Sequence, residues 1–280
     1  MAEGVLLRDI PQAVLDDIGD SLQHFLVPIV GLADEQHPDP LRLIGSGTLV
    51  TSVGRHYVLT AAHVWDAAKT FPTIGLTLTS EYLSWFAIPR ENLFARTIQG
   101  ATFGEFGPDM ALVPLPENHV SRILAHKSFL NLARQRDVFA SEPFTVERGL
   151  WAIAGVPNAL SEIRSQHELR EYEANLIGGL FFGGIVDARD RDGWDFLEVR
   201  ADVSLPGVPG RFGGVSGGGL WQVLLSRSEP NGPISWTREA RLRGIAFWEY
   251  PIPGQPRELR LRCHGPRSLF ERAWGEWGLS

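Results

Sequence analysis

Apolar residues recur at helical spacing near the start of the chain. Between positions 9 and 25 they occupy every fourth position, as Ile10, Val14, Ile18 and Leu22. This period places them on one face of a helix, with aspartates on the other faces. Pro11 suits a first helical turn and Asp9 can cap it. The pattern predicts an N-terminal helix over 9–25.

After residue 25 the pattern changes to short apolar runs separated by Gly, Pro, Asp and Asn. Six runs precede residue 118, from "HFLVPIVGL" to "MALVPL", and six follow residue 145, from "GLWAIAGV" to "ELRLRCH". Many short strands at this spacing are typical of antiparallel sandwiches or barrels. The chain is therefore expected to be all-β, with two sets of six strands.

The remaining segments divide the chain. Residues 119–144 are more polar and partly helical in pattern, which indicates a linker, and the charged segment 158–176 indicates an exposed excursion. "GPRSLFERAWGEWGL" has Pro at a first helical position and an apolar face, so a closing helix is predicted. The expected units are a helical extension, a first strand unit, a linker, a second strand unit and a C-terminal helix, at 1–24, 25–118, 119–144, 145–264 and 265–280.

Composition and charge narrow the function classes. The 280 residues are 44% hydrophobic and 21% charged, as in globular proteins with a full core. A net charge of −7 argues against a nucleic-acid surface. The start lacks a secretory pattern and the apolar runs are too short to span a membrane, so a soluble cytoplasmic protein is expected. Cys263 is the only cysteine and the eight histidines show no H-x-x-x-H, so neither metal nor cofactor is expected.

Three segments carry residues suited to nucleophilic catalysis. His63 follows a strand in "VLTAAHVW", Asp109 opens one in "FGPDMALVPL", and Ser216 lies among glycines in "GRFGGVSGGGLW". A serine hydroxyl needs an adjacent base, which a histidine supplies, and a carboxylate on the other ring nitrogen orients that histidine. Taken singly, each residue is more often a packed histidine, a turn aspartate or a loop serine.

The glycine-rich stretch has three possible explanations: a flexible linker, a phosphate-binding loop, or a turn whose amides face a reacting atom. A linker would not carry Phe212, Val215 and Trp221 among its glycines. A phosphate loop would read G-x-x-x-x-G-K-[ST], which is missing. The third explanation is favoured.

Together, "TAAHV", "PDMAL" and "GVSGGGL" resemble, in order, the active-site motifs of the chymotrypsin/trypsin-like serine peptidases, usually T-A-A-H-C, D-[IL]-A-L and G-D-S-G-G-P. The resemblance extends over about residues 25–278. It implies two six-stranded antiparallel β-barrels with the site in the cleft between them. It also implies that His63 is the general base, Asp109 orients it and Ser216 attacks, with the amides of Gly214 and Ser216 as the oxyanion hole.

The same resemblance suggests substrate-binding residues. "RGIAFWEYP" is similar to the family's G-I-V-S-W-G strand, so the backbone from Phe247 through Trp248 to Glu249 would pair with an extended peptide. Trp248 alone is as readily explained by core packing. Gly210 falls at the base of the primary pocket, with Arg211 beside it. The base therefore has no acidic residue to receive Lys or Arg, so the pocket differs from that of trypsin. Glu249 would narrow the pocket, favour a basic side chain at its entrance, or point to solvent.

Two departures from the family matter. Val215 stands where secreted zymogens carry an Asp that receives a newly cut N-terminal ammonium, so activation by that route is not expected. Phe247 replaces a serine that often bonds the catalytic aspartate, so another group must support Asp109.

The sequence thus predicts a cytoplasmic serine endopeptidase that cuts protein or peptide substrates. Because free proteolysis is harmful inside a cell, a restraint is expected from the helix at 9–25, from the excursion at 158–176, or from a regulatory protein partner. One alternative is a catalytically inactive barrel that binds peptides or acts as a scaffold. Another is a peptidase that cuts only itself, once.

Overall fold

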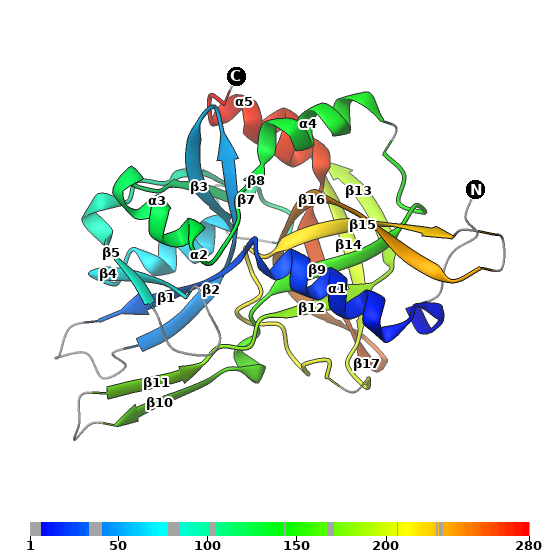
Figure 1. The fold of residues 1–280 in the computed structure, drawn as a ribbon, viewed down its shortest axis with the longest axis horizontal. Coiled ribbons are helices and arrows are strands. Elements are labelled where there is room, and N and C mark those ends of the chain that lie inside the picture. Colours follow the sequence, from blue (N-terminus) through cyan, green and yellow to red (C-terminus); the bar gives the residue numbers. More distant parts are fainter. Residues whose placement is uncertain are drawn as a thin grey trace.

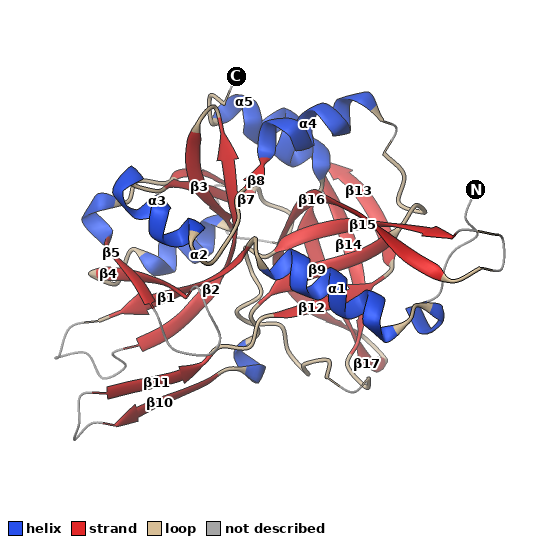
Figure 2. Cartoon of the chain, in the orientation of Figure 1, coloured by secondary structure: helices blue, strands red, loops and turns tan. Residues whose placement is uncertain are grey.

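The structure is a computed structural model that describes residues 7–33, 41–77, 85–100, 105–142, 144–166, 171–205, 207–227, 229 and 232–279. Strands dominate it, arranged in two large antiparallel sheets with helices at their margins (Figure 1, Figure 2). The expectation of a mainly β protein built from two antiparallel units is confirmed.

The first sheet is built from the N-terminal set of strands. Its order is β5-β4-β1-β2-β3-β7-β6, and the short β8 (Leu130–Asn131) pairs with β2 in parallel. The strands are β1 (Leu26–Leu32), β2 (Leu41–Ser52), β3 (Arg55–Thr60), β4 (Thr73–Thr77), β5 (Trp85–Pro89), β6 (Arg96–Gln99) and β7 (Asp109–Pro114).

The second sheet is built from the C-terminal set. Its order is β12-β9-β15-β16-β17-β14-β13, and β10 (Glu162–Gln166) and β11 (Glu171–Asn175) form a separate hairpin within the predicted excursion. The strands are β9 (Leu150–Gly155), β12 (Gly179–Gly183), β13 (Ile185–Arg191), β14 (Trp194–Asp202), β15 (Gly219–Arg227), β16 (Ile234–Ile252) and β17 (Gln255–His264).

The two sheets share one pattern of connections. In each, the two strands at the ends of the order are consecutive in the chain: β5 and β6 in the first sheet, β12 and β13 in the second. Six strands per closed barrel were expected, whereas the hydrogen-bonded order among the described residues has seven along its path and stays open. In the first set, β5 lies outside the expected runs and is followed by the 3-10 turn η2 (Arg90–Asn92). In the second set, one expected run is divided at Gly184 between β12 and β13.

The predicted N-terminal helix is present as α1 (Gln12–Gln23) and follows a 3-10 turn η1 (Leu7–Asp9). Ile18 and Leu22 are buried, as the spacing predicted, and α1 packs against β1, β12 and β16. The helix begins after Pro11 with no side-chain cap, so the expected cap by Asp9 is wrong. Because α1 contacts both sheets, its apolar face is part of the main core.

Other helices connect and close the sheets. They are α2 (Ala62–Ala68), α3 (Glu117–Leu124), α4 (Leu132–Ser141), the 3-10 turn η3 (Asn158–Leu160), the π-helical η4 (Ser268–Ala273) and α5 (Trp274–Glu276). The predicted closing helix thus exists, and its predicted apolar residues Leu269, Phe270 and Trp274 are buried. Helix α4 lies beside this C-terminal segment at one end of the molecule (Figure 2). The predicted linker therefore contains two helices.

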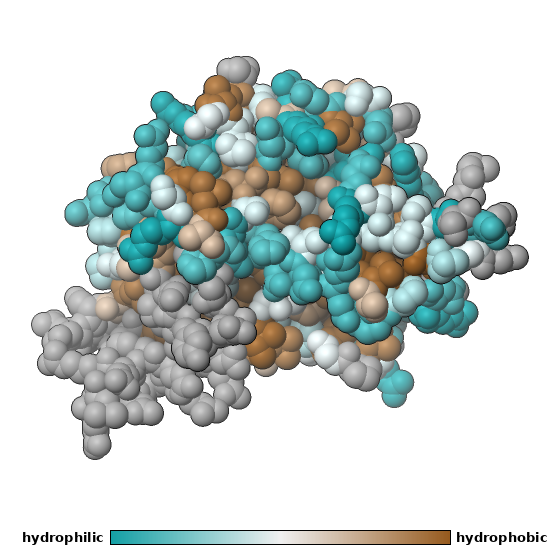
Figure 3. All heavy atoms as spheres, in the orientation of Figure 1, coloured by the Kyte–Doolittle hydropathy of each residue, from teal (hydrophilic) through white to brown (hydrophobic). Residues whose placement is uncertain are grey.

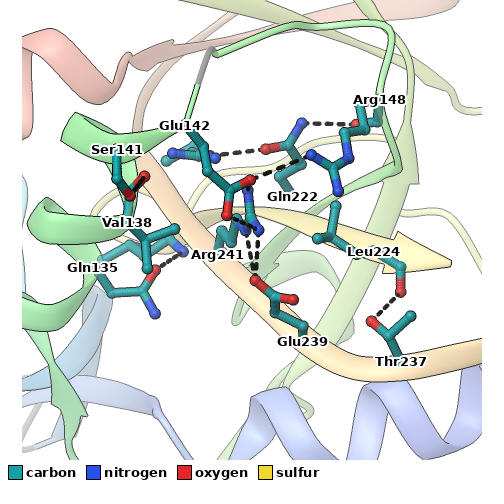
Figure 4. A network of polar contacts seen from close by, with 12 residues as sticks. Gln135, Val138, Ser141, Glu142, Arg148, Gln222, Leu224, Thr237, Glu239 and Arg241 are labelled. Carbon is teal, nitrogen blue, oxygen red and sulfur yellow. Dashed lines mark hydrogen bonds and ion pairs between the residues drawn. The ribbon is translucent and has the colours of Figure 1, made fainter.

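A polar network ties the linker to the second sheet (Figure 4). Just after α4, the carboxylate of Glu142 accepts hydrogen bonds of 2.8 and 3.0 Å from both terminal nitrogens of Arg241 on β16. The side-chain amide of Gln222 on β15 donates to the carbonyl of Arg148, and its oxygen accepts from buried Arg243. Burial lowers the pKa of the Arg243 guanidinium to about 10. These bonds fix where the chain enters the second sheet.

Hydrophilic residues cover most of the face drawn in Figure 3, with apolar surface in small patches between them. In the part of the chain that the structure describes, no helix has the length and apolar character needed to cross a membrane.

Candidate functional site

Strand pairing brings His63 and Asp109 together. Strand β3 ends at Thr60, and α2 begins at Ala62, so His63 lies in the first turn of that helix. Strand β7 pairs antiparallel with β3, with Ala111 opposite Thr60. Asp109, the first residue of β7, therefore lies beside the turn that leads into α2.

The Asp109 carboxylate contacts the histidine twice. Its Oδ1 accepts the backbone N–H of His63 at 2.9 Å, and its Oδ2 lies 2.5 Å from Nδ1 of the same ring. The first contact also places a negative charge at the N-terminus of α2, where the helix dipole favours it. Asp109 is buried, whereas the His63 side chain retains 28% of its exposure. The Nδ1 side of the imidazole ring is thus held by Asp109, while the rest of the ring reaches the surface.

The loop around Ser216 is held by its own amides. Val215 donates to the carbonyl of Phe212 at 2.9 Å, and Gly218 donates to the carbonyl of Val215 at 2.8 Å. The amide of Gly217 donates to Ala246 on β16 at 2.7 Å. The loop is therefore a tight double turn fixed to the second sheet.

Two of its glycines are required by conformation and space. Gly214 and Gly217 have φ angles of +93° and +86°, which favour glycine. A Cβ at Gly217 would lie 2.1 Å from Oγ1 of Thr60, and one at Gly214 would lie 2.6 Å from the carbonyl oxygen of Val156. The loop thus presses against the end of β3, three residues before His63. This close approach and the positive φ angles explain why glycine stands at 214 and 217.

The amides of Gly214 and Ser216 differ from their neighbours. Among the described residues, neither amide has a protein acceptor, whereas those of Val215, Gly217 and Gly218 all do. Ser216 itself is half-buried. These are the two amides that the sequence analysis assigned to an oxyanion hole, and each can donate a hydrogen bond to a ligand oxygen.

Strand β2 lies between the serine loop and α2. The amide of Ser46 donates to the Ser216 carbonyl at 2.9 Å. A Cβ at Gly45 would lie 3.0 Å from that same carbonyl oxygen and 2.7 Å from the side chain of Val64, the neighbour of His63. The backbone at Ser216 and the start of α2 therefore flank one short segment of β2.

A second histidine forms a hydrogen bond with the backbone of Asp109, and the sequence analysis did not identify it. Nε2 of His264, the last residue of β17, accepts the backbone N–H of Asp109 at 3.0 Å. The ring is fully buried and stacks on Phe247 with ring centroids 4.4 Å apart. A lone histidine at the end of an apolar strand gave no signal of this contact. His264 contacts the backbone of Asp109 rather than its carboxylate.

Burial sets the charge state of His264. Desolvation lowers its pKa to about 4, although the nearby Asp109 charge opposes the shift. The ring is therefore neutral near pH 7, and because Nε2 accepts a bond, its proton resides on Nδ1. That Nδ1 has no partner within the described residues.

The predicted substrate-binding residues occupy different positions. Gly210 and Arg211 are exposed, Phe247 is buried against His264, and Trp248 is half-buried. The Glu249 carboxylate accepts the backbone N–H of Phe212 at 2.5 Å. This contact links β16 to the loop that carries Ser216.

The segment before Asp109 is fastened to the second sheet by Arg262 of β17. Its buried guanidinium pairs with Glu198 at 2.8 Å, donates to the carbonyl of Glu105 at 2.6 Å and lies 3.7 Å from the ring centroid of Phe106. Asp109, which begins β7 of the first sheet, is thus also tied to β17 of the second sheet, through this segment and through His264.

The residues that the structure describes contain no group of three or more His, Cys, Asp or Glu arranged to hold a metal ion. No protein-family model matches the chain, and no curated protein matches it. It is similar to a chain in a solved structure from work on aromatic interactions in the coupled folding and binding of the disordered VPg protein of Sesbania mosaic virus. The identity is 13%, the coverage is 89% of this chain and 90% of that one, and the TM-score is 0.45. Similarity at this level assigns neither a family nor a function.

Proposed function

We propose that this protein is a chymotrypsin-like serine endopeptidase that hydrolyses peptide bonds of protein substrates through His63, Asp109 and Ser216. The observation that carries the proposal is the double contact of the buried Asp109 carboxylate with the backbone and Nδ1 of a half-exposed histidine. A carboxylate on Nδ1 selects the tautomer whose Nε2 carries the lone pair and can act as a base.

In the proposed reaction, Nε2 of His63 removes the proton from the Ser216 hydroxyl as its oxygen attacks the substrate carbonyl. The resulting imidazolium is stabilised by Asp109 and then donates its proton to the leaving amine. The amides of Gly214 and Ser216 receive the negative charge on the carbonyl oxygen, a contribution of about 10²–10³ in rate for each donor. Water completes the cycle by hydrolysing the acyl-enzyme.

The sheet connections support the double-barrel part of the proposal. Each sheet would close into a barrel through the chain itself, because its end strands are consecutive. His63 and Asp109 come from the first unit and Ser216 from the second, so we propose that the site lies at their junction. We propose that an extended peptide pairs with the backbone at Phe247–Glu249, with one side chain directed between Gly210 and Glu249.

Of the three candidates for a restraint on activity, we retain two. Because Ile18 and Leu22 on α1 are buried in the core, removing that helix would damage the fold, so its deletion cannot report on inhibition alone. The excursion at 158–176 and a regulatory partner remain as proposed restraints, in a cytoplasmic setting.

Labelling with a fluorophosphonate probe tests the function without knowledge of the substrate. The wild-type chain should be labelled, while Ser216→Ala and His63→Ala should not, because only a serine activated by its histidine reacts at a useful rate. Failure of the wild type to react would favour a non-catalytic, peptide-binding protein. Mass spectrometry of the purified chain separates a general peptidase from one that cuts itself once, through a cleavage that is lost in Ser216→Ala.

A further inference from the structure

Ser46 stands out because every polar group it has is used while the residue is fully buried. It lies near the middle of β2, in the first sheet, with no exposed surface. Its hydroxyl donates to the Gly214 carbonyl at 2.8 Å and accepts the Val156 amide at 2.9 Å. Its amide donates to the Ser216 carbonyl at 2.9 Å, and its carbonyl accepts the Thr60 hydroxyl at 2.6 Å.

Two of these bonds hold the serine loop on either side of one peptide group. The Gly214 carbonyl precedes Val215 and the Ser216 carbonyl follows it, so the Val215–Ser216 peptide lies between two fixed points. That peptide carries the Ser216 amide, which has no protein acceptor among the described residues. Glycine at 214 leaves the backbone free to rotate. The Ser46 hydroxyl removes that freedom.

The residue that holds the loop is itself anchored in both sheets. Val156 directly follows β9 of the second sheet, and Thr60 ends β3 of the first. Val215, inside the loop, is an apolar residue buried to 1% exposure, so it offers no charge for an ionic contact. This loop is therefore aligned by neutral hydrogen bonds, and those from Ser46 on β2 are the ones that reach it from the first sheet.

We propose that Ser46 is a positioning residue that aligns the oxyanion amides in the uncut chain, an inference that rests on the proposed function. In this proposal the site is assembled when β2 docks against the serine loop, and insertion of a newly cut N-terminus is not needed. The regulation expected for an intracellular peptidase would act on substrate access or on the contact between the sheets, because the nucleophile loop is already formed.

The test measures fluorophosphonate inactivation of the full-length chain, separating kinact from KI. Ser46→Ala should lower kinact about ten- to a hundredfold and leave KI unchanged, since the loop is misaligned while the probe still binds. The matched control is Ser52→Ala, which removes a buried hydroxyl from the same strand, one that has no partner within the described residues. This control should keep the wild-type kinact.

The possible outcomes distinguish the proposed role of Ser46 from the proposed peptidase function on which it rests. Wild-type kinact in folded Ser46→Ala, with Ser216→Ala unreactive, would overturn the role of Ser46 and leave the peptidase proposal intact. An unreactive wild type would overturn both. Should Ser46→Ala not fold, Ser46→Cys fills the same space with a weaker donor, and an unchanged kinact in that variant would overturn the inference equally.

Discussion

Two buried aspartates, one in each sheet, perform the same structural task with different consequences. Asp109 begins β7 and accepts the amide of His63 at the start of α2. Asp195, near the start of β14, accepts the amides of Arg267 and Ser268 at the start of the closing helix, at 3.1 and 2.5 Å. Both carboxylates cap a helix N-terminus, where amides lack partners and negative charge is favoured.

The difference lies in what the capped helix presents. At Asp195 the second contact is a hydroxyl: Oγ of the fully buried Ser268 bonds both the amide and the carbonyl of Asp195. At Asp109 the second contact is an imidazole ring that reaches the surface. A helix cap thus becomes a candidate acid–base site once the helix offers a titratable side chain at an exposed edge.

The two sites are joined at the end of β17. His264 accepts the amide of Asp109, and the next residue, Gly265, donates to the carbonyl of Asp195 at 2.8 Å. The closing helix and the candidate site therefore depend on the same turn of chain. Changes on the two sides should separate activity from stability.

The largest expected difference is in reactivity. Asp109→Asn should lower fluorophosphonate labelling by about 10⁴-fold, because the amide holds the wrong tautomer of His63. Asp195→Asn should keep labelling within about threefold and lower only the free energy of unfolding, because it breaks a cap. Rates of labelling and urea midpoints of both variants test this. Equal losses of labelling would show that Asp195 is not merely structural.

The next effect is the pH dependence of stability. His264 has a folded-state pKa of about 4, below the value of about 6.5 expected in the unfolded chain. Between these two pH values the unfolded chain binds more protons than the folded chain does. The contribution of neutral His264 to the free energy of unfolding is therefore fully present above about pH 6.5. That contribution falls by about 3 kcal/mol as the pH decreases toward 4.

His264→Gln keeps an acceptor for Asp109 but cannot titrate. Urea unfolding at about pH 7 and about pH 4.5 should give a smaller difference for this variant than for the wild type. Identical pH dependence in both proteins would show that His264 is not the buried group responsible.

A smaller loss is expected from Ser268→Ala. The amide of Asp195 would lose its acceptor inside the core, at a cost of about 1–3 kcal/mol in the free energy of unfolding. Labelling should be unchanged. A calorimetric melt and the labelling rate, measured on the same sample, distinguish this result from a loss transmitted through His264 to Asp109.

The smallest effect is expected from Arg267→Ala. Its half-exposed guanidinium pairs with Asp190 and lies 3.9 Å from Asp195. Ion pairs of this kind contribute about 0–1 kcal/mol, and salt screens them. The urea midpoint should move little, and less at high salt. A shift as large as that of Ser268→Ala would mean that the side chain, rather than the backbone, of residue 267 anchors the helix.

Local pattern predicted the elements whose signal lies within the chain itself. The four-residue period gave α1, and alternating short runs gave two groups of strands. Helix α2 was missed because seven residues carry too little period to register. Strand β5, with five residues, was not among the predicted runs, and the run that contains β12 does not show that the strand stops at Gly184. Three separate motifs pointed to His63, Asp109 and Ser216.

What the sequence by itself determined was the set of chemical groups and their order: a histidine after one strand, an aspartate before another, and a serine among glycines. Only the tertiary structure decided which groups hold them. His264 meets Asp109 across 155 positions, and Ser46 meets Gly214 across 168. Such contacts arise from sheet packing, which no local spacing encodes, because each partner taken alone resembles an ordinary buried residue.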